Sequence, residues 1–77
     1  MVYQTSIDDV VFRVNEDRSL SVFMRFNPER NIIISYDDMC IIQNDYRSAN
    51  RIYKLFGLLF WTDCLNGKSS NWNLETI

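Results

Sequence analysis

The chain has 77 residues, of which 47% are hydrophobic and 14% aromatic, and its formal net charge is −2 from ten acidic and eight basic residues. This length predicts one small domain spanning residues 1–77, and the hydrophobic content excludes a disordered chain. The near balance of charge excludes a general nucleic-acid binder, which needs a basic excess, and a DNA mimic, which needs dense carboxylates.

The first half of the chain predicts a three-stranded antiparallel sheet. Residues 9–14 and 20–26 are rich in β-branched and aromatic side chains, which favours two strands, and the polar segment 15–19 joins them as a hairpin loop. Pro28 interrupts the pattern because proline cannot donate to a strand ladder. The Ile-rich run 31–35 is the third strand, and the short connections favour a meander.

The segment 36–44 allows two interpretations. As a helix it begins with Ser35 as the N-cap and Asp38 three residues later, which is the capping-box pattern. As a strand it would pair with residues 32–34 across Asp37-Asp38, which is not the Asn-Gly or Asp-Gly of two-residue hairpins. The helix is favoured, and the strand alternative stays open.

A second helix is predicted over residues 46–66. An unbroken helix from residue 36 to residue 65 would be about 45 Å long, too long for so small a domain to cover, so we expect a break near Asn44. The pair Asn66-Gly67 is a conventional helix stop. The tail, residues 71–77, is expected either to add an extra edge strand or to fold back over the helix.

These elements predict an α+β fold in which one face of the sheet packs against the helical second half. The side chains expected to face inward share the period of their elements. They are Val10, Phe12, Val14, Leu20, Val22, Met24, Phe26, Ile32 and Ile34 from the sheet, and Ala49, Ile52, Tyr53, Phe56, Leu59 and Phe60 from the helix.

The last turns of the second helix are apolar on every side. Leu58, Trp61 and Leu65 lie where polar residues lie in the earlier turns. Exposed apolar patches that hold a tryptophan are typical of protein-binding surfaces, so these residues, with Trp72, are candidate partner-binding residues. The alternative is that the tail covers this face and makes it a second small core.

A basic stripe on the same helix offers a second candidate surface. Arg47, Arg51 and Lys54 share one face and are candidates for contacts with phosphates or with an acidic partner. A third candidate is the outward face of the sheet, where Arg13 and Arg25 alternate with Phe23. The simpler interpretation of both surfaces is solvated protein surface.

Groups that commonly carry chemistry are missing from the sequence. The chain has no histidine, which removes the commonest general base and metal ligand, and Cys40 and Cys64 are too far apart for a zinc motif. Neither glycine belongs to a phosphate-binding loop. We therefore expect no catalytic residue, no metal and no cofactor.

The sequence also indicates where the protein works. Its first residues lack the basic start and apolar stretch of a signal peptide, and its longest nearly apolar run is far shorter than a bilayer needs. Two cysteines are too few for a disulfide framework. A cytoplasmic protein with free thiols and no membrane partner is therefore expected.

The leading functional hypothesis is a non-enzymatic protein-interaction module that occludes or bridges a larger protein partner. The small size and missing catalytic groups are typical of phage or mobile-element inhibitors of a host or defence complex, and homodimerisation is a further expectation. The alternative is a small accessory protein that binds nucleic acid weakly through the basic helix stripe or the sheet face.

Overall fold

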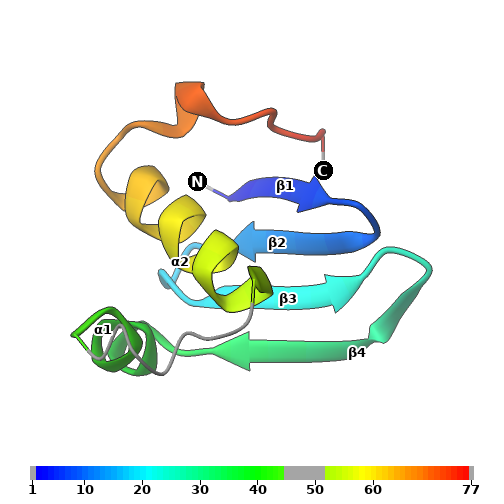
Figure 1. Cartoon of the computed structure of the whole chain (residues 1–77), viewed down its shortest axis with the longest axis horizontal. Coiled ribbons are helices and arrows are strands. Elements are labelled where there is room, and N and C mark those ends of the chain that lie inside the picture. Colours follow the sequence, from blue (N-terminus) through cyan, green and yellow to red (C-terminus); the bar gives the residue numbers. More distant parts are fainter. Residues whose placement is uncertain (1, 45–51, 77) are drawn as a thin grey trace.

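The computed structural model describes residues 2–44 and 52–76. Within these residues the elements follow in the order β1 (Tyr3–Ile7), β2 (Val10–Val14), β3 (Leu20–Met24), β4 (Asn27–Ile34), α1 (Tyr36–Asn44), α2 (Ile52–Leu65) and the 3-10 turn η2 (Ser69–Asn71) (Figure 1). The α+β class is confirmed, with an antiparallel sheet and helices on one of its faces.

The described strands form one sheet in the order β1-β2-β3-β4, and each neighbouring pair is antiparallel. Three of these strands match the predicted ones. The strand that the sequence did not predict is β1, whose Gln4 and Ser6 gave it no apolar run. The two-residue turn Asp8-Asp9 joins it to β2, and Asp8 adopts φ +53°, a conformation that aspartate tolerates.

The boundaries of the last hairpin differ from the predicted ones. Strand β3 ends at Met24, Arg25 and Phe26 form the turn, and β4 begins at Asn27. Pro28 therefore lies inside a strand. It is tolerated there because β4 is at the edge of the sheet and the pairing with β3 shifts register between Val22 and Met24.

The helical segment 36–44 has the predicted bounds. The Ser35 hydroxyl accepts a hydrogen bond from the backbone N–H of Asp38 at 3.2 Å, which confirms Ser35 as the N-cap. The described part of the second helix, α2, runs to Leu65, and its predicted beginning at residue 46 lies outside the described residues.

The predicted stop at Asn66-Gly67 is confirmed. The N–H of Lys68 donates to the carbonyl of Asp63 at 2.8 Å and the N–H of Gly67 to that of Cys64 at 3.2 Å. With Gly67 at φ +77°, this is a Schellman motif, in which glycine takes the left-handed position.

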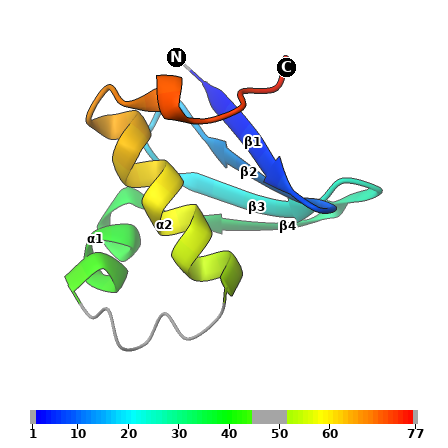
Figure 2. The ribbon, with the colours of Figure 1, turned by 45° about the horizontal axis from the view of Figure 1, so that its top comes forward.

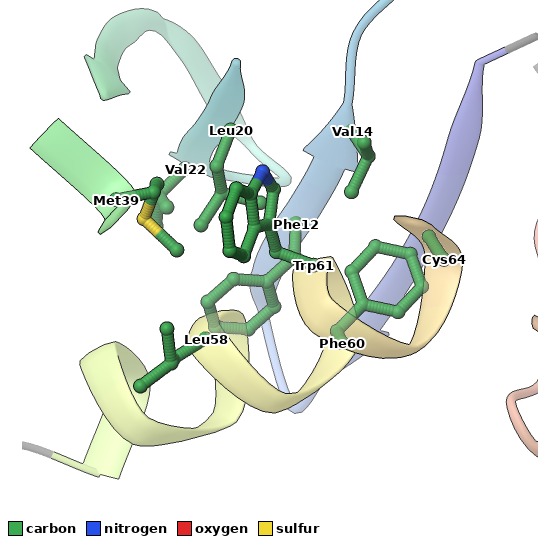
Figure 3. Close-up of a cluster of buried hydrophobic side chains, with 9 residues drawn as sticks. All are labelled: Phe12, Val14, Leu20, Val22, Met39, Leu58, Phe60, Trp61 and Cys64. Carbon is green, nitrogen blue, oxygen red and sulfur yellow. The ribbon is translucent and has the colours of Figure 1, made fainter. Parts of the chain in front are cut away.

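Helix α2 lies obliquely across one face of the sheet, mainly against β2 and β3, and α1 lies beside it (Figure 2). Gly57 is at the closest approach: a Cβ there would lie 3.0 Å from both Leu20 Cδ2 and Phe12 Cδ1. The core between helix and sheet consists of Phe12, Val14, Leu20, Val22, Met39, Leu58, Phe60, Trp61 and Cys64 (Figure 3).

This core corrects part of the expected one. Met24, Phe26, Ile32 and Leu59 were expected inside and are exposed. Met24 and Ile32 lie where no described helix covers the strands, and Phe26 lies in the β3–β4 turn. Leu59 faces outward because the close approach at Gly57 turns the neighbouring face of α2 toward the sheet. Ala49 and the side chains of Ile52 and Tyr53 lie outside the described part of the structure.

Of the two alternatives for the tail, the described residues show the fold back over the helix, and residues 73–76 are not assigned as an edge strand. Trp72 folds back over α2, with its ring edge-on to Phe56 and Phe60 at centroid distances of 4.9 and 5.3 Å. The chain then follows β1, where the N–H of Glu75 donates to the carbonyl of Gln4 at 2.8 Å. The tail therefore lies along the β1 edge of the sheet (Figure 2).

Candidate interaction surfaces

The central part of the predicted docking patch is buried. Leu58 is 4% exposed and Trp61 is 2% exposed, so neither is available at the surface of the single chain. The indole Nε1 of Trp61 donates to the backbone carbonyl of Arg18 at 2.7 Å, which satisfies its one polar atom. The expectation that these two side chains form an exposed patch is wrong.

The tail does not supply the cover that the alternative interpretation required. Trp61 lies against α1 and the β2–β3 loop: its ring is 5.7 Å from that of Tyr36, and Arg18 lies over the Tyr36 ring at 5.6 Å. The buried Met39 joins the same cluster from α1. The helix 36–44 thus shelters the second apolar face of α2.

The other predicted site residues are spread over different parts of the molecule. Leu65 is partly exposed at the end of α2, and Trp72 is half-buried in the tail. Lys54 borders an apolar depression between the helices and β3–β4. Arg47 and Arg51 lie outside the described residues. The described residues therefore do not bring the predicted set together as one site.

A different apolar surface emerges at the end of the sheet that holds the β1–β2 and β3–β4 turns. There α2 has left the sheet uncovered (Figure 1). Ile7, Val10 and Met24 are cross-strand neighbours on the helix side, and Ile32 lies on the same face of β4. Met24 is 46% exposed and Ile32 59%. We call these four residues the open platform.

The open platform is hollowed and has a basic border. A shallow depression with a mainly apolar lining lies between β2, β3 and β4, with Arg30 at its margin. Lys54 borders the neighbouring depression, where the helix-side faces of β3 and β4 meet α1. Among the described residues the structure shows no ion pair for either cation. The surface therefore combines exposed aliphatic side chains with positive charge.

The apolar residues of the open platform are visible in the sequence. Whether they are covered depends on the position of α2, which Gly57 determines. In a helix that is apolar all round, periodicity does not choose the face that meets the sheet. Gly57, which has no side chain, determines which face of α2 packs against the sheet and therefore where α2 lies over it. Which end of the sheet is exposed can be predicted only when the position of α2 is known.

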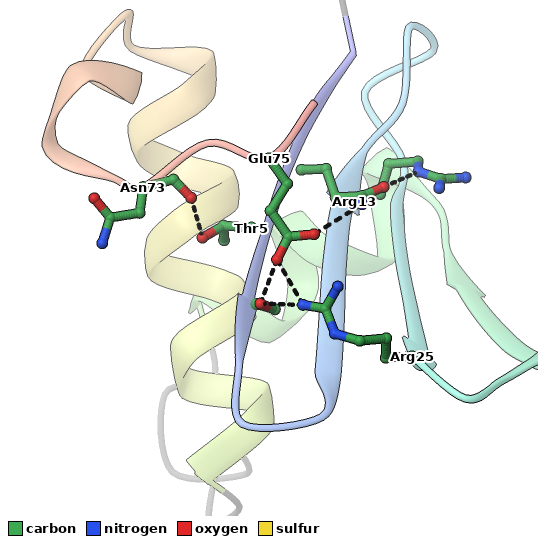
Figure 4. A network of polar contacts seen from close by, with 7 residues as sticks. Thr5, Arg13, Arg25, Asn73 and Glu75 are labelled. Carbon is green, nitrogen blue, oxygen red and sulfur yellow. Dashed lines mark hydrogen bonds and ion pairs between the residues drawn. The ribbon is translucent and has the colours of Figure 1, made fainter. Parts of the chain in front are cut away.

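The opposite face of the sheet has a polar network (Figure 4). Glu75 pairs with Arg25 at 2.7 Å and accepts hydrogen bonds from Ser6 and from Gln4 Nε2, the latter at 3.1 Å. The hydrogen bonds from Arg25, Ser6 and Gln4 lower the pKa of Glu75 from 4.5 to about 2, and Glu75 in turn raises the pKa of Arg25. This carboxylate fastens the tail to β1 and to the β3–β4 turn.

The arginines on this face are occupied within the chain. Arg13 Nε donates to Gln4 Oε1 at 2.8 Å and its guanidinium lies 5.1 Å from the centre of the Phe23 ring. Arg25 is bound to Glu75. The sequence predicted correctly that Arg13 and Phe23 share a face, but their contacts are with each other and with neighbouring side chains.

The buried thiol of Cys64 lacks the setting of a reactive cysteine. Burial, and to a lesser extent the nearby Asp63 carboxylate, raise the pKa of Cys64 to about 11, so the thiolate is scarce at neutral pH. Cys40 is half-buried and, like Cys64, is not part of a disulfide.

Residues 2–44 and 52–76 contain no group of three or more His, Cys, Asp or Glu side chains arranged to hold a metal ion. No helix in this part of the chain is both long and apolar enough to cross a bilayer.

Comparison with known proteins does not assign the chain to a family: no family model matches it, and no curated protein or solved structure is significantly similar to it.

Proposed function

We propose that this protein is a non-enzymatic protein-interaction module, and that the open platform receives an amphipathic helix of a larger protein. The single observation that carries the proposal is the incomplete cover of the sheet: Met24 and Ile32 are exposed on the face whose other end is buried under α2.

The dimensions of the fold favour a helix as the occupant. Strands β1, β2 and β3 have five residues each and β4 has eight. The face is therefore roughly 19 Å wide and at least roughly 17 Å long, whereas one helix is about 10 Å across. Helix α2, with α1 beside it, leaves the end at the β1–β2 and β3–β4 turns uncovered (Figure 1). A further helix laid over that end would complete the two-layer arrangement that apolar sheet faces normally reach.

The charges beside the platform favour an acidic helix. Arg30 and Lys54 border the depressions on this face. A helix with an apolar stripe and a flanking Asp or Glu would bury its stripe on Met24 and Ile32 and place its carboxylate near Arg30. Rim charges of this kind guide association and orientation more than they add affinity.

Such binding would occlude the partner's helix. In this proposal the protein acts as small phage or mobile-element inhibitors of host or defence complexes would act, by covering a surface that the partner needs. Because Lys54 borders an apolar depression and Arg13 and Arg25 are engaged within the chain, no observation on the described residues favours the nucleic-acid alternative.

Site-specific photo-crosslinking in the cells that naturally make the protein tests the proposal. A photoreactive amino acid at Met24 is compared with one at Ser70, an exposed residue of η2. We expect a product with a larger protein from position 24 alone, with the crosslink mapping to the apolar stripe of a helix. The product should disappear with Ile32→Asp, whose folding is checked by circular dichroism.

Several results of the crosslinking experiment would contradict the proposal. Equal products from positions 24 and 70, no product from position 24, or a product that nucleases remove would each overturn the proposal. A crosslink to an extended segment would refute the helix as the occupant.

A further inference from the structure

One edge of the sheet is covered by the tail, and none of the described strands pairs with the other edge. Along β1 the tail is bound through the Glu75–Gln4 backbone hydrogen bond and through the hydrogen bond from Thr5 Oγ1 to the carbonyl of Asn73, at 3.0 Å. On the other side, β4 ends the strand order, and none of the described strands pairs with its outer edge.

The hydrogen bonds of the sheet show which backbone groups of β4 point outward. Arg25 N–H donates to the Asp9 carbonyl and Asn15 N–H to the Ser19 carbonyl, so the odd-numbered residues of β3 bond to β2. Because bonding alternates along an antiparallel strand, the even-numbered residues of β3 bond to β4. Their partners are Ile32 and Ile34.

The same alternation leaves the backbone N–H and C=O of Asn31 and Ile33 directed to the outer edge. A contact at the other edge of the sheet supports this alternation. Extended to β1, the alternation directs the carbonyl of Gln4 outward, and that carbonyl accepts the hydrogen bond from the N–H of Glu75. Strand β4 therefore offers a pairing edge whose side chains are apolar on both faces, with Ile32 59% and Ile33 65% exposed.

We propose that two copies of this chain pair through β4, antiparallel and about a two-fold axis perpendicular to the sheet, to form one continuous eight-stranded sheet. The bonds are made by the outward groups of Asn31 and Ile33, and the isoleucines of one copy meet those of the other. The dimer shares Ile32 and Arg30 with the open platform and its border, but its first test substitutes Ile33, whose side chain lies on the opposite face. A failure of the pairing is therefore distinguishable from a failure of the platform.

Charge supports a second copy as the occupant of this edge. In an antiparallel pair the first half of one strand lies beside the last half of the other. Arg30, in the first half of β4, then approaches the first turn of the partner's α1, where Asp37 and Asp38 are exposed. The two-fold axis makes this favourable contact twice.

The state of the other edge explains why pairing stops at two copies. A protein with two open edges can add copies without limit, whereas self-pairing through one edge is closed. The tail along β1 leaves β4 as the edge for pairing in the described structure. The axis also places the helices of both copies on the same face, so the two open platforms lie side by side, as a bridging protein requires.

Analytical ultracentrifugation of the whole chain tests the pairing. We expect the mass of two chains at about 100 µM, since an edge-to-edge interface is in the small size class. Ile33→Pro removes one outward N–H without removing a bond to β3, and should give a monomer with unchanged circular dichroism. Ile33→Val, the matched control, retains the N–H and should remain dimeric.

A charge exchange tests the orientation. Arg30→Glu should raise the dissociation constant about tenfold, which corresponds to a modest pair of charge contacts. Combining Arg30→Glu with Asp37→Lys and Asp38→Lys should restore the original value. A failure to restore it would overturn the antiparallel arrangement.

Amide hydrogen exchange of the unaltered chain keeps the proposal testable if Ile33→Pro does not fold. The N–H of Ile33 should become more protected as the protein concentration rises, while that of Asp8, in an exposed turn, should not change. A monomer at about 1 mM, or a dimer in which the Ile33 amide exchanges as fast as that of Asp8, would overturn the proposal, because interfaces of the small size class still associate at such concentrations.

Discussion

The two ends of the helix-side face of the sheet have similar side chains and different surroundings. At one end Phe12, Leu20 and Val22 are buried, and at the other Met24 is exposed. Ile32, beside Val22 on the edge strand β4, is exposed as well. The difference comes from the position of α2, which Gly57 holds close to β2 and β3. Apolar sequence alone therefore does not make a core: a core needs a second layer over it.

Replacing Trp61 tests the covered end with the largest expected effect. Trp61→Ala should lower the free energy of unfolding by about 3–5 kcal/mol, because it removes a buried ring and leaves a cavity between α1, α2 and the sheet. Chemical denaturation measures this. A folded variant with unchanged stability would return Trp61 to the surface and revive its predicted role as a docking residue.

Two adjacent leucines of α2 separate the buried face from the exposed one. Leu58→Ala should cost about 2–5 kcal/mol and Leu59→Ala less than about 0.5 kcal/mol, since only Leu58 is in the core. Each variant is the control for the other, because both make the same chemical change in the same helical turn. Similar costs, or the reverse order, would mean that α2 is rotated relative to the arrangement described above.

Adding one methyl group at the contact between α2 and the sheet should have a smaller effect. In an exposed helix Gly57→Ala would stabilise by about 1 kcal/mol through helix propensity. Here the new Cβ would meet Phe12 and Leu20 at 3.0 Å, so we expect a net loss of about 1–2 kcal/mol from overpacking. A stabilised variant would show that α2 can move outward easily, and that the boundary of the open platform can move with it.

The sequence predicted the parts of this fold that depend on local signals. Ser35 marked the start of α1, Asn66-Gly67 marked the end of α2, and the alternating segment marked β3. The two helix-end signals act through hydrogen bonds within a few residues of chain, and the alternation follows from the two faces of the strand itself. The sequence did not predict β1, because that strand is stabilised by its pairing with β2 and by contacts with the tail, about 70 residues away in sequence.

The candidate site could not be predicted from local signals, because the burial of its residues depends on contacts between distant parts of the chain. Burial of Trp61 depends on Tyr36, Met39 and the carbonyl of Arg18, which no periodicity within α2 can indicate. The sequence predicts an excess of apolar surface and places it at the end of the helix. The described structure has its exposed apolar surface at the end of the sheet instead.

Acid should weaken the attachment of the tail, which is the smallest of these effects. The pKa of Glu75 is about 2 in the folded chain against an ordinary 4.5, so its contacts contribute stability that is full above pH 4.5. That contribution is lost as the pH falls from 4.5 toward 2. The slope of unfolding free energy against pH in this window should be smaller in Glu75→Gln than in the unaltered chain.

The matched control is Glu16→Gln, in an exposed loop residue for which the structure shows no ion pair among the described residues. It should leave the slope unchanged. Comparing the two variants separates Glu75 from the other carboxylates that titrate in the same range. If both variants follow the unaltered chain, the carboxylate of Glu75 does not fasten the tail. The tail would then be held along β1 by its backbone hydrogen bond to Gln4 and by the packing of Trp72 on α2.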